Sequence, residues 1–400
     1  MLINLRNALM AGKRLPYDAE VEFLESTGGQ YINTGVLASA ALNDAQIDIT
    51  YSSSSTSGDL YIFGGGATFN TAIQCVINSS SNYFQPSWGQ SLAIANGYAA
   101  NAVATLRMTY NDYALTFGTT TRTGAFTATS RTFDDRAIYL FRGNRTSGGI
   151  NTKPVRIYAF KISRNGIPIL DLIPVRKGAV GYLYDRVSGK LFGNAGTGDF
   201  VLGPDVVPVE YIESHGTEYI DTGLVGRDGY DFEYRFRPMN PLPCGIGGEY
   251  QDNKNCYIGL VRTNGYLAYH FYDSQADILQ VQQLALGADY NIKAHLYSGE
   301  QYFEVNGVRG GAGSRTGTFT SSYNLYLFAI NSANQPAIFG VMRLYNLTAR
   351  LNTIPIRSFR PVRVGTEGAM MDVLTRRIYR NQGTGAFTCG NDLKYPIPAE

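Results

Sequence analysis

The fold is decided by a stretch that the chain contains twice. Residues 21–35 read VEFLESTGGQYINTG, and residues 209–223 read VEYIESHGTEYIDTG. Nine of these fifteen positions are identical, and four others are close exchanges such as Phe for Tyr and Asn for Asp. Four more blocks recur in the same order at an offset of 187 residues: YLF at 139–141 and 326–328, RIY at 156–158 and RLY at 343–345, PVR at 174–176 and 361–363, and NAGTGDF at 194–200 and NQGTGAF at 381–387.

Five blocks in one order at a near-constant offset indicate tandem duplication of a whole domain, because this period is far too long for a solenoid repeat. We therefore expect an N-terminal arm at 1–19, a first domain at 20–203 and a second domain at 206–400. The linker between the domains is the short Gly203-Pro204-Asp205 segment.

The composition and the local patterns predict an all-β protein. Charged residues make up only 16% of the chain, which contains 29 Tyr and 20 Phe, and aromatic side chains fit a pleated, half-buried surface. Residues 232–236 alternate with period two, and residues 301–305 do the same before Asn306-Gly307, a dipeptide suited to a hairpin turn. No apolar helical stripe of useful length is present, so many short strands predict a jelly-roll β-sandwich in each copy.

Several classes of function are excluded at this level. The formal net charge of +2 argues against nucleic acid as a partner. The uncharged stretch most worth checking as a membrane span, 88–106, contains polar side chains that would be costly in a membrane. Four cysteines without a CxxC pair, and three histidines, predict neither a disulfide scaffold nor a metal site. No dinucleotide or phosphate-binding motif appears, so no cofactor is expected.

The repeated blocks resemble a known family. VEYIESHGTEYIDTG resembles the start of concanavalin A-like (laminin-G-like) jelly-roll domains, and GYLYDRVSGKLFGNAGTGDF at 181–200 resembles the end of these domains. The resemblance covers both copies, essentially residues 20–390, and such domains are abundant in proteins of gut bacteria and their phages. It implies two tandem jelly-roll sandwiches in which the last strands return beside the first.

Some repeated residues have a physical interpretation of their own. Asp185 and Asp372 precede turns, and we interpret them as turn formers, with calcium ligands as the alternative. Asn194 and Asn381, each followed closely by Gly-Thr-Gly, predict a bulged closing turn. In the second copy Arg376 replaces Gly189, which predicts a different hairpin there.

We expect no catalysis. Glu20, Glu22 and Glu25 come close to the carboxylate pattern of jelly-roll glycosidases, which need two carboxylates across the sugar cleft. The position of Glu20 is Pro208 in the second copy, however, and the pattern lies on the predicted first strand. All three histidines belong to the second copy, and no Gly-x-Ser-x-Gly motif accompanies them.

Glycan binding remains open, because aromatic rings can stack on sugar rings. The candidate residues are Tyr83, Trp88, Tyr250 and Tyr257. The alternative for Trp88, the only Trp, is that it fills the core of the first sandwich.

The arm has no counterpart before the second copy. It carries apolar and basic side chains that would bind a partner as a short helix or an added strand: Leu5, Arg6, Leu9, Met10, Lys13 and Arg14. The alternative is a frayed terminus.

These features together favour a non-enzymatic structural virion protein of a phage of gut bacteria, namely a capsid decoration, head fibre or tail adhesin. The arm would bind other virion proteins, the chain would form a homo-oligomer, and the sandwiches would display glycan-binding surfaces. The chain would then pass from the host cytoplasm into the virion. The first alternative is a secreted or surface glycan-binding protein, for which we expect an export signal that residues 1–19 do not show. A polysaccharide-cleaving enzyme is the lesser alternative.

Overall fold

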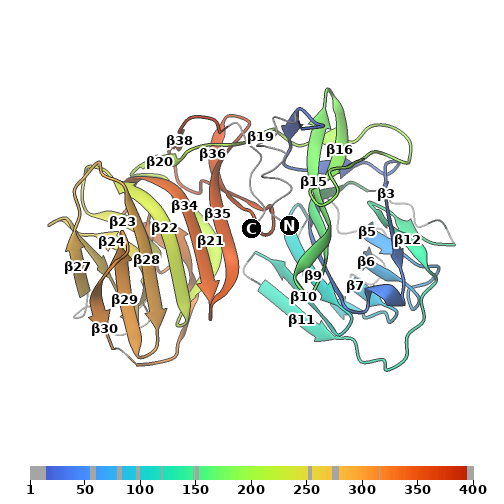
Figure 1. The fold of residues 1–400 in the computed structure, drawn as a ribbon, viewed down its shortest axis with the longest axis horizontal. Coiled ribbons are helices and arrows are strands. Elements are labelled where there is room, and N and C mark those ends of the chain that lie inside the picture. Colours follow the sequence, from blue (N-terminus) through green and yellow to red (C-terminus); the bar gives the residue numbers. More distant parts are fainter. Residues whose placement is uncertain are drawn as a thin grey trace. The chain divides into compact units, whose positions relative to one another are not determined.

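A computed structural model describes residues 15–54, 60–78, 83–95, 100–118, 120–146, 148, 153–250, 255–272, 279–314 and 316–393. The chain divides into two compact units, residues 1–206 and 207–400. Each unit is a sandwich of two sheets whose strands pair almost entirely antiparallel (Figure 1). The predicted all-β class with tandem jelly-roll sandwiches is therefore confirmed.

The first unit contains a larger and a smaller sheet. The strands of the larger sheet are β1 (Ala19–Glu20), β2 (Leu24–Ser26), β4 (Ala45–Ser53), β9 (Ala104–Thr109), β10 (Asp112–Phe117), β11 (Thr120–Ala125), β14 (Val155–Arg164), β15 (Ile167–Lys177), β16 (Val180–Asp185), β17 (Leu191–Phe192) and β18 (Val201–Leu202). Those of the smaller sheet are β3 (Ile32–Ala38), β5 (Leu60–Gly65), β6 (Ile73–Asn78), β7 (Tyr83–Trp88), β8 (Ile94–Ala95), β12 (Arg136–Leu140) and β13 (Gly143–Asn144), and a 3-10 turn, η1 (Ala40–Leu42), follows β3.

The second unit repeats this plan. The strands of its larger sheet are β19 (Val206–Pro208), β20 (Ile212–His215), β22 (Tyr230–Pro238), β28 (Tyr290–Tyr297), β29 (Glu300–Val305), β30 (Val308–Gly313), β34 (Val341–Leu351), β35 (Ile354–Val364), β36 (Glu367–Asp372), β37 (Ile378–Arg380) and β38 (Thr388–Cys389). Those of the smaller sheet are β21 (Ile220–Arg227), β23 (Cys244–Tyr250), β24 (Asn255–Val261), β25 (Tyr266–Tyr269), β26 (Phe271–Tyr272), β27 (Leu279–Gln283), β31 (Thr320–Leu327), β32 (Ile330–Ser332) and β33 (Gln335–Ala337).

The two larger sheets have the same strand order. It runs β11-β10-β9-β4-β14-β15-β16-β17 in the first unit and β30-β29-β28-β22-β34-β35-β36-β37 in the second. Each strand of one order has its counterpart at the same place in the other, as duplication of a whole domain requires.

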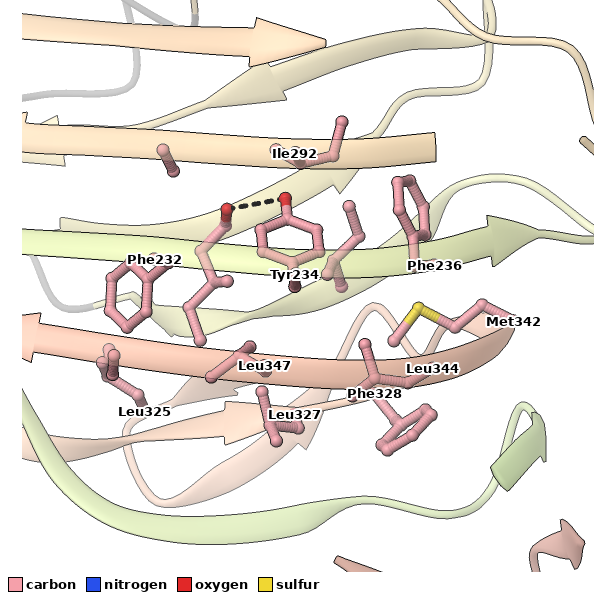
Figure 2. Close-up of a cluster of buried hydrophobic side chains, with 14 of the residues drawn as sticks. Phe232, Tyr234, Phe236, Ile292, Leu325, Leu327, Phe328, Met342, Leu344 and Leu347 are labelled. Carbon is pink, nitrogen blue, oxygen red and sulfur yellow. Dashed lines mark hydrogen bonds between the residues drawn. The ribbon is translucent and has the colours of Figure 1, made fainter. Parts of the chain in front are cut away.

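The core of the second unit shows why its strands alternate. Phe232, Tyr234 and Phe236 of β22 are buried and lie among apolar side chains of β31 and β34 (Figure 2). The Tyr234 hydroxyl donates a hydrogen bond to the Ile258 carbonyl at 3.1 Å, so this polar group is satisfied inside the core. Because successive side chains of a strand point to opposite faces, Glu233 and Arg235 lie on the outer face of the same sheet.

The closing loop of each unit is attached to its opening strand by one asparagine. The Asn194 Oδ1 accepts hydrogen bonds from the Tyr31 amide at 3.1 Å and from the Gly196 amide at 2.8 Å. Asn381 does the same in the second unit, with the amides of Tyr219 and Gly383 as donors. The repeated NxGTG phrase is therefore a device that joins the two ends of each sandwich.

Asp185 and Asp372 both form turns. The Asp185 carboxylate accepts from the amides of residues 187 and 188, and the Asp372 carboxylate accepts from the amide of residue 374 and the hydroxyl of residue 375. The prediction that the second hairpin differs was wrong. The amide of Arg376 donates to the Asp372 carbonyl as that of Gly189 does to Asp185, and Arg376 adopts φ +61° where the glycine has +75°.

Residues 17–20 belong to the first sandwich. Tyr17 is 7% exposed and its ring lies 5.0 Å from that of Tyr184, while β1 pairs with β15. The sandwich therefore includes Tyr17, which lies three residues before the expected boundary at residue 20. The arm residues Leu5, Arg6, Leu9, Met10, Lys13 and Arg14 lie outside the described residues.

The cysteines are free thiols, with Cys75, Cys244 and Cys256 buried and Cys389 half-buried. Within the described ranges, no group of three or more His, Cys, Asp or Glu side chains could hold a metal ion. No helix of the described chain has the length and apolar character needed to cross a membrane.

Candidate functional site

The candidate site is a hollow on the outer face of the larger sheet of the second unit. Its volume is about 540 Å³. Five neighbouring strands, β29, β28, β22, β34 and β35, contribute side chains to it, and the main polar groups are those of Glu304, Asn291, Lys293, Glu233, Asn346 and Arg360. Because the apolar side chains of these strands fill the core, the polar ones are left for this surface.

The strand register arranges the lining in two parallel rows. In the first row Glu304 lies opposite Lys293, Lys293 opposite Glu233, and Glu233 opposite Thr348. Residues paired in this way share one face of the sheet. The first row is therefore a line of charged and hydroxyl groups that crosses four strands.

The second row lies two residues further along each strand. Asn291 is opposite Arg235, and Arg235 is opposite Asn346. Arg360 continues this row on β35, because it lies two residues beyond Ser358, the partner of Thr348. Amide and guanidinium groups thus form one side of the hollow, and the row with both carboxylates forms the other.

The second row is held rigidly. The Asn346 Oδ1 accepts a hydrogen bond from the Arg235 amide at 3.1 Å, which leaves the Asn346 amide nitrogen as a donor toward the hollow. Arg235 and Arg237 each donate to Asp289 at 2.7 Å, and the Tyr345 hydroxyl donates to the same carboxylate at 2.9 Å. These three donors, Arg237 foremost, hold the pKa of Asp289 well below its usual range.

The first row is less completely paired. Glu233, whose side chain is 48% exposed, forms an ion pair with Arg350 at 3.0 Å. Lys293 and Glu304 make no ion pair with any residue that the structure describes, although they are cross-strand neighbours. Both charges are therefore available to a bound molecule.

A stack of rings borders the hollow. His295 lies 4.1 Å from the ring of Tyr297 and 4.7 Å from that of Tyr302, measured between centroids, and the Arg309 guanidinium lies 3.7 Å from the centroid of Tyr302. The Asp231 carboxylate contacts the His295 Nδ1 at 2.6 Å and accepts from the Tyr297 hydroxyl at 2.9 Å. Burial, together with Asp231, raises the pKa of Tyr297 to about 12. These contacts fix the rim of the hollow.

The matching face of the first unit is built differently. Lys161 lies where the second unit has Thr348, and its ammonium lies 3.9 Å from the Asp48 carboxylate. Burial raises the pKa of Asp48, although Lys161 opposes the shift. Ile173 lies where the second unit has Arg360, and it is buried in a cluster with Tyr17. An ion pair and an apolar cluster thus stand in the first unit where the second unit has Thr348 and Arg360.

None of the four aromatic candidates lines this hollow. Trp88 is 0% exposed within the core of the first unit, so the core alternative applies and the hypothesis that it binds glycans is wrong. Tyr257 is also buried, in a small cluster that Tyr250 partly covers. Tyr250 itself is half-buried, and Tyr83, at 37% exposed, has the most accessible ring of the four, on β7 of the first unit.

The carboxylates of the opening block have structural roles. Glu25 accepts a hydrogen bond from Arg156 and so ties β2 to β14. Glu213 and Arg343 repeat this pair between β20 and β34. Both arginines lie 4.4 Å from an aromatic ring, which Phe23 provides in the first unit. Removing either carboxylate would therefore weaken packing.

Sequence reasoning missed the hollow, although one signal pointed to it. The alternation at 232–236 predicts that Glu233 and Arg235 share the face opposite to the aromatic residues, and residues 291, 293 and 295 continue the pattern on the next strand. The sequence does not say which strands lie beside β22, so the set could not be assembled.

Neither a protein-family model nor a curated protein matches the chain by sequence. Among solved structures, it is similar to domains LG4-5 of the mouse laminin alpha1 chain, with 12% identity and a TM-score of 0.30 over 86% of this chain and 93% of that chain. It is also similar to the LG1-3 region of the laminin alpha2 chain, with 12% identity and a TM-score of 0.31 over 94% of this chain and 66% of that chain. A candidate carbohydrate-binding protein from Bacteroides ovatus shares 11% identity and a TM-score of 0.35 over 96% of both chains. Likenesses of this size support no inference about function.

Proposed function

We propose that this chain is a glycan-binding protein without catalytic activity, and that the hollow on the second unit is its binding site. One observation carries the proposal: two rows of hydrogen-bonding side chains from five adjacent strands line one open hollow. Polar groups that converge in a concave surface fix the orientation of a bound molecule.

The chemistry of the rows suits a ligand rich in hydroxyl groups. A hydroxyl both donates and accepts hydrogen bonds, so its site must offer both kinds of partner. Lys293, Arg360 and the Asn346 amide nitrogen donate, whereas Glu233 and Glu304 accept. Hydrogen bonds to charged groups contribute more than neutral ones, roughly 1.5–3 kcal/mol each, so a few contacts suffice for measurable affinity.

The geometry favours binding over cleavage. Glu304 and Glu233 lie two strands apart, about 10 Å between their backbones, and Lys293 lies on the strand between them. A glycosidase needs its two carboxylates on either side of the scissile bond. The second carboxylate must be able either to attack the sugar directly or to activate a water molecule that does so. Here an ammonium group lies between them. Glu25 and Glu213 are occupied by their arginines.

We expect Asn346→Ala to weaken glycan binding about fivefold to tenfold, because it removes one half-buried donor from the hollow. Retardation in polyacrylamide gels that contain a soluble polysaccharide measures this directly. Gln46→Ala, on the corresponding face of the first unit, is the matched control and should bind like wild type. Equal retardation of all three proteins would show that glycans bind elsewhere.

We infer, in addition, that the chain works on a phage virion, where the arm attaches it to other virion proteins and the second unit presents the hollow. The support is the sequence of residues 1–14, which has no counterpart before the second copy. Several arms in a homo-oligomer would bind together with greater avidity than one. A secreted or surface glycan-binding protein would use the same hollow, so only its location distinguishes the two.

The arm can be tested with a chain that begins at Leu15. Since the sandwich includes Tyr17 and β1, this chain should melt within a degree or two of full-length protein, but only full-length protein should purify with phage particles. A chain that begins at Glu20 should melt lower, because it lacks the contact of Tyr17 with Tyr184. If the chain from Leu15 still joins the particles, attachment does not depend on the arm.

A further inference from the structure

We propose that the hollow binds an internal stretch of a linear, uncharged polysaccharide lying across the strands, and not a terminal sugar or a polyanion. This inference rests on the proposed function and specifies the ligand for the same site. Three features of the hollow support it: the shape of the hollow, the balance of charge among its side chains, and the distance between Glu304 and Arg360 at its two ends.

The shape comes from the register. The lining spans β29 to β35, which are five adjacent strands, so its length is roughly four strand spacings, or about 19 Å. Its width is two rows that lie two residues apart along each strand, or about 7 Å. A surface this long and narrow fits a chain of roughly three to four pyranose rings joined end to end, with further rings free to extend at both ends.

The mixed charge of the lining disfavours ligands of strong charge. Among the side chains that line the hollow, Glu304 and Glu233 carry two negative charges and Lys293 and Arg360 carry two positive ones, while Arg350, which is not part of the lining, pairs with Glu233. The signs alternate along the first row, from Glu304 through Lys293 to Glu233. A polyanion would meet both carboxylates, and a chain of amino sugars would meet Lys293 between them. A neutral polyhydroxylated chain avoids both conflicts and can hydrogen-bond to every one of these groups.

The two ends of the hollow are far apart. Glu304 on β29 and Arg360 on β35 are separated by three intervening strands, so one or two sugar rings cannot contact both. The middle of the hollow, with Glu233 and Asn346, would contact a ligand of any length. Chain length should therefore decide which side chains contribute to affinity.

The first measurement uses the intact protein in gels that contain xylan, mannan, mixed-linkage glucan or hyaluronan. At least one neutral polysaccharide should retard the protein, and hyaluronan should not. Di-, tetra- and hexasaccharides of the polysaccharide that binds are then titrated by calorimetry. The tetrasaccharide should bind at least tenfold more tightly than the disaccharide, with little further gain for the hexasaccharide. Borohydride reduction of the chain end should leave the affinity for the hexasaccharide unchanged.

Variants at the two ends provide the sharper test. Both Glu304→Ala and Arg360→Ala should weaken tetrasaccharide binding about fivefold or more, while at least one of them leaves disaccharide binding unchanged. If the disaccharide binds as tightly as the tetrasaccharide and still responds to Asn346→Ala, the site binds a short ligand and only this inference is overturned. Binding of hyaluronan alone would overturn it as well. Failure of every polysaccharide to retard the protein would overturn the proposed function itself.

Discussion

At pH 8 the variant Glu249→Gln should be more stable than the wild type by up to about 4 kcal/mol, whereas near pH 4.5 the two proteins should be almost equally stable. Glu249 is 0% exposed inside the second unit. Burial raises the pKa of its carboxyl from 4.5 to about 8, and the Ser321 hydroxyl opposes only part of this shift. The carboxyl packs directly against Gly226, where even a methyl group would not fit.

The direction of the effect follows from proton linkage. Between pH 4.5 and about 8 the folded protein keeps the proton on Glu249, while the unfolded chain has lost it. Where the folded state binds more protons, the free energy of unfolding falls as the pH rises. A shift from 4.5 to about 8 corresponds to about 4–5 kcal/mol, since each pKa unit is worth about 1.4 kcal/mol. Glutamine resembles the protonated acid in shape but does not ionise, so this loss should be absent in the variant.

Urea unfolding followed by far-ultraviolet circular dichroism, repeated from pH 4.5 to 8.5, measures this difference. Glu367→Gln is the matched control, because Glu367 is 68% exposed and should show the pH dependence of wild type. Trp88, the only Trp, lies in the first unit, so its fluorescence follows that unit separately. Parallel pH profiles for wild type and Glu249→Gln would mean that the carboxyl is ionised and solvated in the folded protein.

The sequence could predict the fold because its evidence is local and repeated. The opening and closing blocks each contain the residues that join them, namely Asn194 with Tyr31 and Asn381 with Tyr219. Two copies of such a device imply two closed sandwiches. Each opening block also ends in a local turn, in which the side chain of Asn33 or Asp221 accepts a hydrogen bond from the amide two residues later.

The predictions for the hairpin at Arg376 and for Tyr17 were wrong for a common reason. In both places the contacts with neighbouring residues decide the structure, and the local sequence pattern does not. Gly189 in the first copy suggests that only glycine can adopt the left-handed conformation at this position. Arg376 adopts it in the second copy, because the Asp372 carboxylate and the backbone hydrogen bonds fix the turn. Tyr17 seemed to belong to the arm because the repeat begins at Val21. It packs on β16, a strand that lies far away in sequence.

The candidate site could not be assembled from the sequence, because its residues lie far apart along the chain. Glu233, Lys293, Asn346 and Arg360 come together only through the order of four strands. Alternation within one strand says which side chains share a face. It does not say which strands are adjacent, nor that the shorter Thr348 lies at the position where Lys161 forms an ion pair in the first unit.

Trp88 is a candidate glycan-binding residue that turns out to be part of the core of the first unit. It ends β7 opposite Ile73 of β6, and its side chain is fully buried. Arg131 donates to its backbone carbonyl at 3.3 Å and so holds the loop at 126–131 against it. The indole Nε1 is buried and has no hydrogen-bond partner among the described residues, so the ring contributes through packing alone.

Replacing Trp88 by Ala should therefore lower the free energy of unfolding of the first unit by about 3–5 kcal/mol, because it removes the largest buried side chain and leaves a cavity. Trp88→Phe should cost much less, since it keeps most of the apolar volume and removes an unpaired donor. Tyr83→Ala, at an exposed position of the same strand, should change stability little. Urea unfolding followed by circular dichroism measures all three, and gels containing polysaccharide show whether binding persists. A Trp88→Ala protein of wild-type stability that no longer binds glycans would restore the sugar-binding role and move the site to the first unit.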